Sequence, residues 1–183
     1  MIAHTHRLMG DFLYHQLSTP LKAKLNYQRF VNGNIKPDVV KKYKQMSHYY
    51  QDNEDDVFGM FETLLHEPLS LTEFSDLAGV LLHFICDYAC IYHANAYIRK
   101  DNTLAAHIQY ETRLHYLALR KIKKIKEVPF IAFKSLEENR RYVRELVRRT
   151  NIPDYRPDIE HDFHEMVKLS LSTLFFLLSQ RNV

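Results

Sequence analysis

The stretch VLLHFICDYACIYH, residues 80–93, sets three polar side chains in a strongly apolar run. Apolar residues recur there at three- and four-residue intervals, which predicts a helix buried in the interior. His83 and Asp87 lie one turn apart on one face of that helix, and His93 falls about 80° farther round. A carboxylate is costly in such surroundings unless it is paired or bound to a metal ion. This stretch therefore predicts a metal site in the core of a helical protein.

The helix expected next along the chain carries a second pair of the same kind. In HIQYE, residues 107–111, His107 and Glu111 again stand four positions apart and share a face. Taken singly, a His-x-x-x-carboxylate pair on a helix is usually a surface pair. Two such pairs on consecutive helices, with His93 between them, favour a metal site built in the core of a helical bundle.

The rest of the chain supports an all-α fold. Its 183 residues include only 4 glycines and 6 prolines, too few for the turns of a many-stranded β fold. We expect a single-domain helical bundle of about six helices over residues 1–183, because the helical period continues almost throughout and no linker or repeat divides the chain. The expected helices cover about 5–17, 55–66, 70–98, 102–128 (starting at Asn102 or Thr103), 135–149 and 159–179, with a helix or helical turns at 39–50.

Composition narrows the class of partner. The 25 basic and 22 acidic residues give a net charge of +3, too balanced to predict binding to nucleic acid or to an anionic membrane. No apolar run reaches the roughly 20 residues that a membrane-spanning helix needs, and the polar start MIAHTHRLMGDF does not resemble a signal peptide. We therefore expect a cytoplasmic protein, and the sequence carries no signal of its oligomeric state. The 11 histidines are the unusual feature, since histidine is the commonest metal ligand.

The order His-x-x-x-Asp, then His, then His-x-x-x-Glu resembles the bacterial zinc-dependent phospholipase C family and the related fungal zinc nucleases. Two further segments extend the resemblance. THRLMGDFL, residues 5–13, is similar to the start of the first helix in that family and places His6 in its ligand position. KPDVVKKYKQMSHYYQD, residues 36–52, matches a Pro-Asp pair followed by a His with aromatic neighbours, which points to Asp38 and His48.

The resemblance covers roughly residues 4–111 and implies a cluster of two or three zinc ions, with the remaining helices as scaffold. In the secreted enzymes the third ion is chelated by the amino group and carbonyl of an N-terminal Trp, and this chain has no Trp. His4 is one replacement, the terminal amine is another, and absence of the third ion is the last alternative. The implied ligand sets are Asp38, His48, His83 and Asp87 for one ion, His93, His107 and Glu111 for a second, and His6 with bridging Asp87, joined by His4 or the amine, for a third.

The function that this resemblance implies is metal-dependent hydrolysis of phosphoester bonds by a metal-activated water, with Asp38 as the base that takes its proton. Clustered zinc ions can neutralise a phosphodiester and stabilise the leaving oxygen. The substrate is expected to be a phosphoester, either phospholipid or a soluble compound. A nuclease-type phosphodiesterase is the enzymatic alternative, and a non-catalytic metal-binding scaffold or sensor is the alternative from another class.

Three further features are expected to be structural. Cys86 and Cys90 stand one turn apart, where a disulfide would close almost no loop, and we expect both in the core. EHDFHE, residues 160–165, opens the last helix, where acidic residues are common. The basic stretches at 121–126 and 140–149 alternate with apolar residues and are expected to be solvated helix faces.

Overall fold

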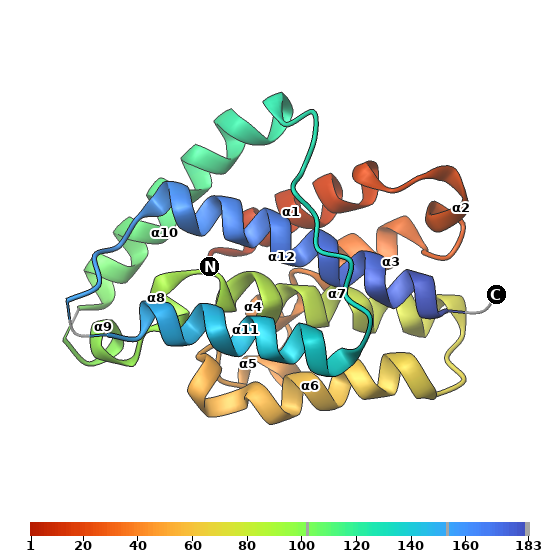
Figure 1. The fold of residues 1–183 in the computed structure, drawn as a ribbon, viewed down its shortest axis with the longest axis horizontal. Helices are drawn as coiled ribbons and strands as arrows, with labels where there is room; N and C mark the ends of the chain where they lie inside the picture. Colours follow the sequence, from red (N-terminus) through yellow and green to blue (C-terminus); the bar gives the residue numbers. More distant parts are fainter. Residues whose placement is uncertain (102, 153, 182–183) are drawn as a thin grey trace.

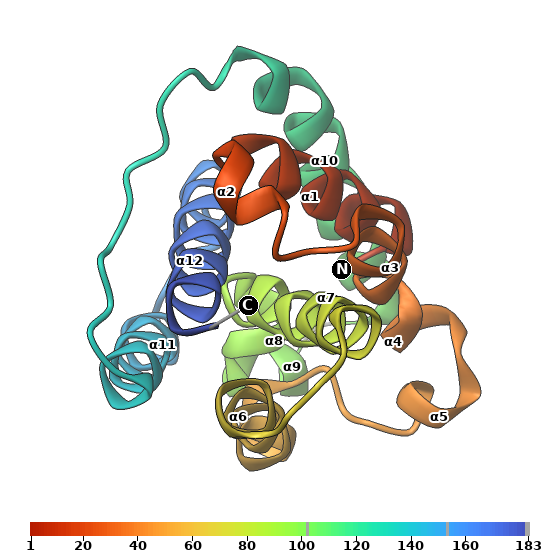
Figure 2. The same cartoon turned by 90° about the vertical axis from the view of Figure 1, so that its right-hand side faces the viewer.

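Helix α7 (Leu71–Tyr88) is the central element of the fold, with other helices on several sides of it (Figure 1, Figure 2). It begins with a capping box, in which the Ser70 hydroxyl accepts the backbone N–H of Glu73 and the Glu73 carboxylate accepts that of Ser70. Every residue from 78 to 88 is buried, which explains why this part of the sequence is apolar on every side except the one that carries His83 and Asp87. α7 packs against α3 (Tyr27–Gly33), α6 (Tyr50–His66) and α12 (Ile159–Gln180).

The all-α prediction is confirmed. Helix accounts for 76% of the structure, and there is no strand within residues 1–101, 103–152 and 154–181, which are the residues that this computed structural model describes. None of the helices described is long and apolar enough to cross a membrane. The other long helices are α1 (Ala3–Gln16), α10 (Leu104–Lys121) and α11 (Leu136–Thr150).

The described part of the chain has twelve α-helices rather than about six, because the prediction counted only the long ones. Connecting segments contain short helices of four to seven residues. The predicted element at 39–50 is not one helix, since extended Val40 separates two helical turns and the chain then unwinds before α6. The remaining short elements are α2 (Thr19–Lys22), α4 (Lys36–Val39), α5 (Lys41–Lys44), α8 (Ile91–Ala94), α9 (Ala96–Asp101) and the 3₁₀ helix η1 (Ile122–Lys124).

The predicted helix at 70–98 is wrong in its second part. α7 ends at Tyr88, Ala89 caps it, and the chain passes through the extended residue Cys90 before it restarts as α8. The physical reason lies on α12, where the buried carboxylate of Asp162 accepts the backbone N–H of Ile91 at 2.8 Å and stabilises the start of α8. His93 therefore stands on a separate short helix, and its direction does not follow from the period of α7.

Capping residues mark two other helix starts. The Ser135 hydroxyl accepts the N–H of Glu138 at the start of α11, as the sequence predicted. At the start of α10, Thr103 is the capping residue and accepts the N–H of Ala106. Asn102, the alternative start, lies outside the described residues.

α3 and α7 cross at a pair of glycines. A Cβ added to Gly79 would lie 2.3 Å from the carbonyl oxygen of Phe30, and one added to Gly33 would lie 2.4 Å from that of Asp76. Only glycine therefore allows the two backbones to approach so closely. This close approach carries Asn34, the residue after α3, to the polar face of α7.

Candidate metal centre

Asp87 is the centre of a buried cluster of ionisable groups. Its carboxylate is fully buried, and its two oxygens face different nitrogens. Oδ2 lies 2.8 Å from Nδ1 of His48 and 3.3 Å from Nε2 of His83. Oδ1 lies 3.2 Å from Nε2 of His6 and 3.7 Å from Nε2 of His93. A carboxylate placed in this way can serve two neighbouring metal ions, one on each oxygen.

His83, one turn before Asp87, is held in one tautomer. Its Nδ1 lies 2.8 Å from the backbone oxygen of Asn34, and because a carbonyl can only accept, Nδ1 carries the hydrogen. Nε2 is then free to bind on the other side, where it lies 3.1 Å from Nδ1 of His48 and 3.9 Å from Oδ1 of Asp38. Hydrogen bonds of this kind orient metal-binding histidines. The hydrogen bond to His83 exists because the glycine crossing of α3 and α7 brings the Asn34 carbonyl close to α7.

α1 brings His6 against the same helix. Its ring stacks on that of His83, with the ring centroids 3.6 Å apart. The His6 ring is fully buried, yet neither of its nitrogens makes a hydrogen bond. Oδ2 of Asp38 is also buried without a hydrogen-bond partner. Because buried polar atoms are nearly always paired, these atoms fit a site that metal ions complete.

His93, His107 and Glu111 form a second group beside the first. Oε1 of Glu111 lies 2.9 Å from Nε2 of each histidine, and the two Nε2 atoms are 3.4 Å apart. His107 and Glu111 share the inner face of α10, as their spacing predicted, whereas His93 reaches them from α8. Two imidazoles and one carboxylate that converge on one point suit a zinc ion that keeps a coordination position open.

The α-amino group of Met1 lies between the two groups. It is 2.5 Å from Oδ1 of Asp87, 2.9 Å from Nε2 of His93 and 3.0 Å from Oε1 of Glu111. Burial lowers the pKa of this amine, but the two carboxylates outweigh burial and raise it to about 11. Of the two replacements considered for the missing Trp, the amine is therefore the one that reaches the cluster.

Eight of the nine residues predicted as metal ligands come together here. His4 does not, since its side chain is exposed on α1 and its ring centroid lies 6.4 Å from that of His115. In each of the three groups, one donor atom per residue lies within 4.8 Å of the others. The groups are His6, His83 and Asp87; Asp38, His48 and His83; and His93, His107 and Glu111.

The protonation states of the most deeply buried donors suit metal binding. Burial lowers the pKa of His93 to about 4 and also lowers the pKa of His6. Burial alone would raise the pKa of Asp87, but the facing imidazoles and the α-amino group outweigh it and hold the pKa well below its ordinary value. The pKa of Glu111 is lowered by the same balance of burial against facing imidazoles and the amine. Neutral imidazoles and ionised carboxylates are the forms that ligate metals.

The cluster opens to solvent on one side. The side chains of Asp38, His48 and His107 are 19%, 22% and 17% exposed, whereas the donors on α1 and α7 are fully buried. A hollow of 150 Å³ adjoins His107 at this side. The hollow is lined by Tyr49, Tyr92, Ile98, Arg99, Thr103, Leu104 and His107.

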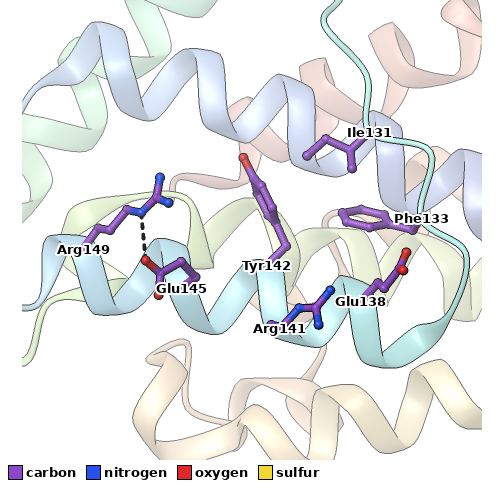
Figure 3. A pocket seen from close by; sticks show the side chains of 7 residues that line it. All are labelled: Ile131, Phe133, Glu138, Arg141, Tyr142, Glu145 and Arg149. Carbon is purple, nitrogen blue, oxygen red and sulfur yellow. Dashed lines mark hydrogen bonds and ion pairs between the residues drawn. The ribbon is translucent and has the colours of Figure 1, made fainter.

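A larger hollow of 620 Å³ lies elsewhere, between α11 and the segment at 131–133 (Figure 3). Its carboxylate Glu145 is already paired with Arg148 and Arg149, at 2.8 Å and 3.0 Å. None of the metal-donor groups found among the described residues lines it. It is therefore not the candidate site. Its lining side chains are Ile131, Phe133, Glu138, Arg141, Tyr142, Glu145 and Arg149.

Asp162 supports the second group from outside, and reasoning from the sequence missed this role. Its buried Oδ2 accepts the N–H of Ile91 and the hydroxyl hydrogen of Tyr110, each at 2.8 Å, and so ties α12 to the two helices that carry this group. Burial raises the pKa of this carboxyl to about 7. The signal in the sequence was its spacing, because Asp162 stands four residues before Met166, on the apolar face of the helix.

The remaining features singled out in the sequence lie outside the cluster. Cys86 and Cys90 are free, buried thiols, and Cys86 contacts the hydroxyl of Ser170 at 3.1 Å. His161 and His164 are exposed on the first turns of α12. None of these four residues belongs to a metal-donor group of the described residues.

Comparison with known proteins gives one match. A family model described as zinc-dependent phospholipase C matches residues 3–168. The match therefore extends beyond the motifs at 4–111 and includes α11 and the first part of α12. No curated protein and no solved structure matches the chain significantly.

Proposed function

The chain belongs to the zinc-dependent phospholipase C family, and from this membership we propose that it hydrolyses phosphoester bonds with zinc ions held in the Asp87 cluster. The observation that carries the proposal is the convergence of eight His, Asp and Glu side chains from six segments of the chain on one site. That site is buried on the side of α1 and α7 and accessible at Asp38, His48 and His107.

We assign two or three zinc ions to the cluster. Imidazole and carboxylate ligands suit zinc, which takes four ligands in structural sites and keeps a position open in catalytic ones. The third ion depends on the Met1 amine, which lies between both groups; because its pKa is raised to about 11, zinc would have to displace a proton from it to bind there. The ligands would be Asp38, His48, His83 and Asp87 for the first ion, His93, His107 and Glu111 for the second, and His6, Asp87 and the Met1 amine for the third.

Zinc supplies such a site with a Lewis acid and a water molecule of lowered pKa. The residues of the chain have separate tasks. Asp38 is partly exposed and has an unpaired Oδ2, so it is placed to take the proton of the attacking water. At the mouth, Tyr92 stacks on His107 with centroids 5.0 Å apart and fixes that ring.

A non-catalytic zinc scaffold is the alternative from another class. Structural zinc sites are closed by four protein ligands, as the first ion would be, whereas the second group offers three side chains, one of which, His107, lines a hollow at the surface. This opening favours hydrolysis. Phospholipid, a soluble phosphoester and single-stranded nucleic acid are the substrates to compare.

The test combines zinc content with turnover. Protein purified without chelator should hold two or three zinc ions per chain and should hydrolyse a chromogenic phosphodiester. His83→Ala and Glu111→Ala should each lose zinc and fall below about 1% of the wild-type rate, because losing a ligand costs more than the 10- to 100-fold that follows loss of an outer hydrogen bond. His66→Ala removes an exposed histidine at the end of α6 and is the matched control.

Two results would contradict the proposal. Full activity in either ligand variant would show that the cluster is not the reaction centre. Zinc-loaded protein that turns over none of the three substrate classes would favour the scaffold.

A further inference from the structure

The two faces of α10 differ: one faces the metal centre and the other faces solvent. The inner face carries His107 and Glu111 into the metal centre and buries Leu114 and Ala118. The outer face carries large apolar side chains in solvent, and the most exposed of them, Leu104, is 75% accessible. Their spacing of three to eight residues sets them along one side of the helix. We call this set the outer strip of α10: Leu104, Ile108, Tyr116 and Leu119.

The helix lies at the margin of the fold and diverges from α12 toward its C-terminal end (Figure 1). Its other side packs on α1 and α12, so the outer strip has no partner helix within the described residues. A water-facing side of a helix ordinarily carries charged and polar residues, and a contiguous apolar strip marks an interaction site.

The charged residues on the outer face of α10 itself are positive. Arg113 and Arg120 stand on the outer face next to Tyr116, and neither forms an ion pair with a carboxylate of the described residues. Glu111 is the single acidic residue of α10, and it points inward to the metal centre. The outer face of α10 thus has apolar residues on one side, arginines on the other and Tyr116 between them. Helices that lie in the interface of a bilayer have this arrangement.

The strip is continuous with the mouth of the metal centre. Leu104 lines the hollow beside His107, so a surface that covers the strip also reaches that opening. An antiparallel pairing centred on the strip would bring Arg113 of one copy close to Arg113 of the other, and this like-charge contact disfavours a dimer through the strip. Anionic lipid headgroups are complementary to the same arginines.

We propose that the outer strip of α10 docks on the surface of an anionic phospholipid bilayer, with Leu104, Ile108 and Leu119 in the interface and Arg113 and Arg120 on the headgroups. Docking would place the opening at His107 against the headgroup layer. The delivery of a lipid phosphoester to the metal centre rests on the proposed hydrolysis. The binding of the strip to the bilayer does not depend on that proposal.

The test is sedimentation with vesicles of phosphatidylcholine and phosphatidylserine in roughly a 3:1 ratio. Leu119→Glu should lower binding about tenfold or more, because it sets a carboxylate in the apolar interface. Leu71→Glu is the matched control, since Leu71 is 41% exposed and Leu119 is 42% exposed, and Leu71 is the first residue of a different helix, α7. Arg113→Gln with Arg120→Gln keeps the apolar strip and should remove the preference for phosphatidylserine.

Turnover of a soluble phosphodiester by the same proteins separates the two proposals. Leu119→Glu should retain it, which shows that the variant is folded and that only docking is lost. Equal vesicle binding by the variants at positions 119 and 71, no vesicle binding by the wild type, or a dimer that Leu119→Glu dissociates would each overturn the docking surface while leaving hydrolysis intact. Vesicle binding without any phosphoester turnover would uphold docking and contradict hydrolysis.

Discussion

The glycine crossing of α3 and α7 gives the sharpest test of how the fold supports the metal centre. In Gly79→Ala, the new methyl group would lie 2.3 Å from the oxygen of Phe30 and 2.8 Å from Cα of Gly33. Both are backbone atoms that cannot rotate away. Ordinary contact begins at 3.4 Å, so α3 must shift from α7 by roughly 1 Å.

Two opposing effects determine how much Gly79→Ala changes the free energy of unfolding. Alanine gains about 1 kcal/mol over glycine in a helix interior, whereas overpacking costs about 1–3 kcal/mol and occasionally more. We expect the cost to win, because whole backbone segments must move, and the zinc-free variant to lose about 1–2 kcal/mol of unfolding free energy. The same shift withdraws the Asn34 carbonyl from Nδ1 of His83, now at 2.8 Å. Zinc affinity should then fall about 10- to 100-fold, as for other lost outer hydrogen bonds.

Gly59→Ala is the matched control and should have the opposite sign. Gly59 is also in a helix, α6, but a Cβ there would meet no atom within 4 Å. This variant should gain about 0.5–1 kcal/mol and keep the zinc affinity of the wild type. Urea denaturation of the zinc-free proteins measures the first effect, and competition with a chromophoric chelator measures the second. Gly79→Ala that is as stable as the wild type would refute the steric argument, and lost stability with unchanged zinc affinity would refute the link through Asn34.

Two further predictions concern pH and metal. Burial raises the pKa of Asp162 to about 7, so between about pH 4 and 7 the folded protein keeps a proton that the unfolded chain releases, and this group's contribution to stability falls as pH rises. Asp162→Asn cannot titrate, and its unfolding free energy relative to the wild type should therefore rise between pH 5 and 7.5 in zinc-free urea titrations; parallel pH profiles would contradict the assignment. Removal of zinc with a chelator should lower the melting temperature, and zinc at about 100 times its dissociation constant should restore about 2.7 kcal/mol. The affinity should weaken below neutral pH, because burial would lower the pKa of His48 but the facing Asp87 carboxylate outweighs it and raises that pKa, so zinc must displace a proton from this ligand. A melting temperature that does not change when zinc is added would show that the donors do not bind it.

The parts of the site that follow from local geometry could be predicted from the sequence. His83 with Asp87, and His107 with Glu111, share a face because four residues make about one helical turn. His6 and the segment with Asp38 and His48 could not be placed by periodicity, and only the family motif pointed to them.

The parts that depend on distant contacts could not be predicted. α7 stops at Tyr88 where the apolar period continues, and the group that starts the next helix, Asp162, stands 71 positions beyond Ile91. The partner of His83 is a backbone carbonyl, which any residue at position 34 would supply, so no residue type marks it. The short helices were missed for the same reason: about six helices were expected and the described residues contain twelve. Helices of a single turn are stabilised by the elements packed around them rather than by their own helix propensity.

The distribution of the donors along the chain also decides which parts of the protein a bound ion would tie together. Met1 stands 86 positions from Asp87, and His48 stands 39 positions from it, yet among the described residues no member of a metal-donor group lies beyond Glu111. Bound zinc would thus hold these segments together in every partly open state that keeps the ion, because each pair of donors closes a long loop. α11 and α12 supply no donor and lie outside every such loop. We therefore expect α11 to unfold locally before the rest of the zinc-loaded protein, while the helices that carry zinc ligands remain folded.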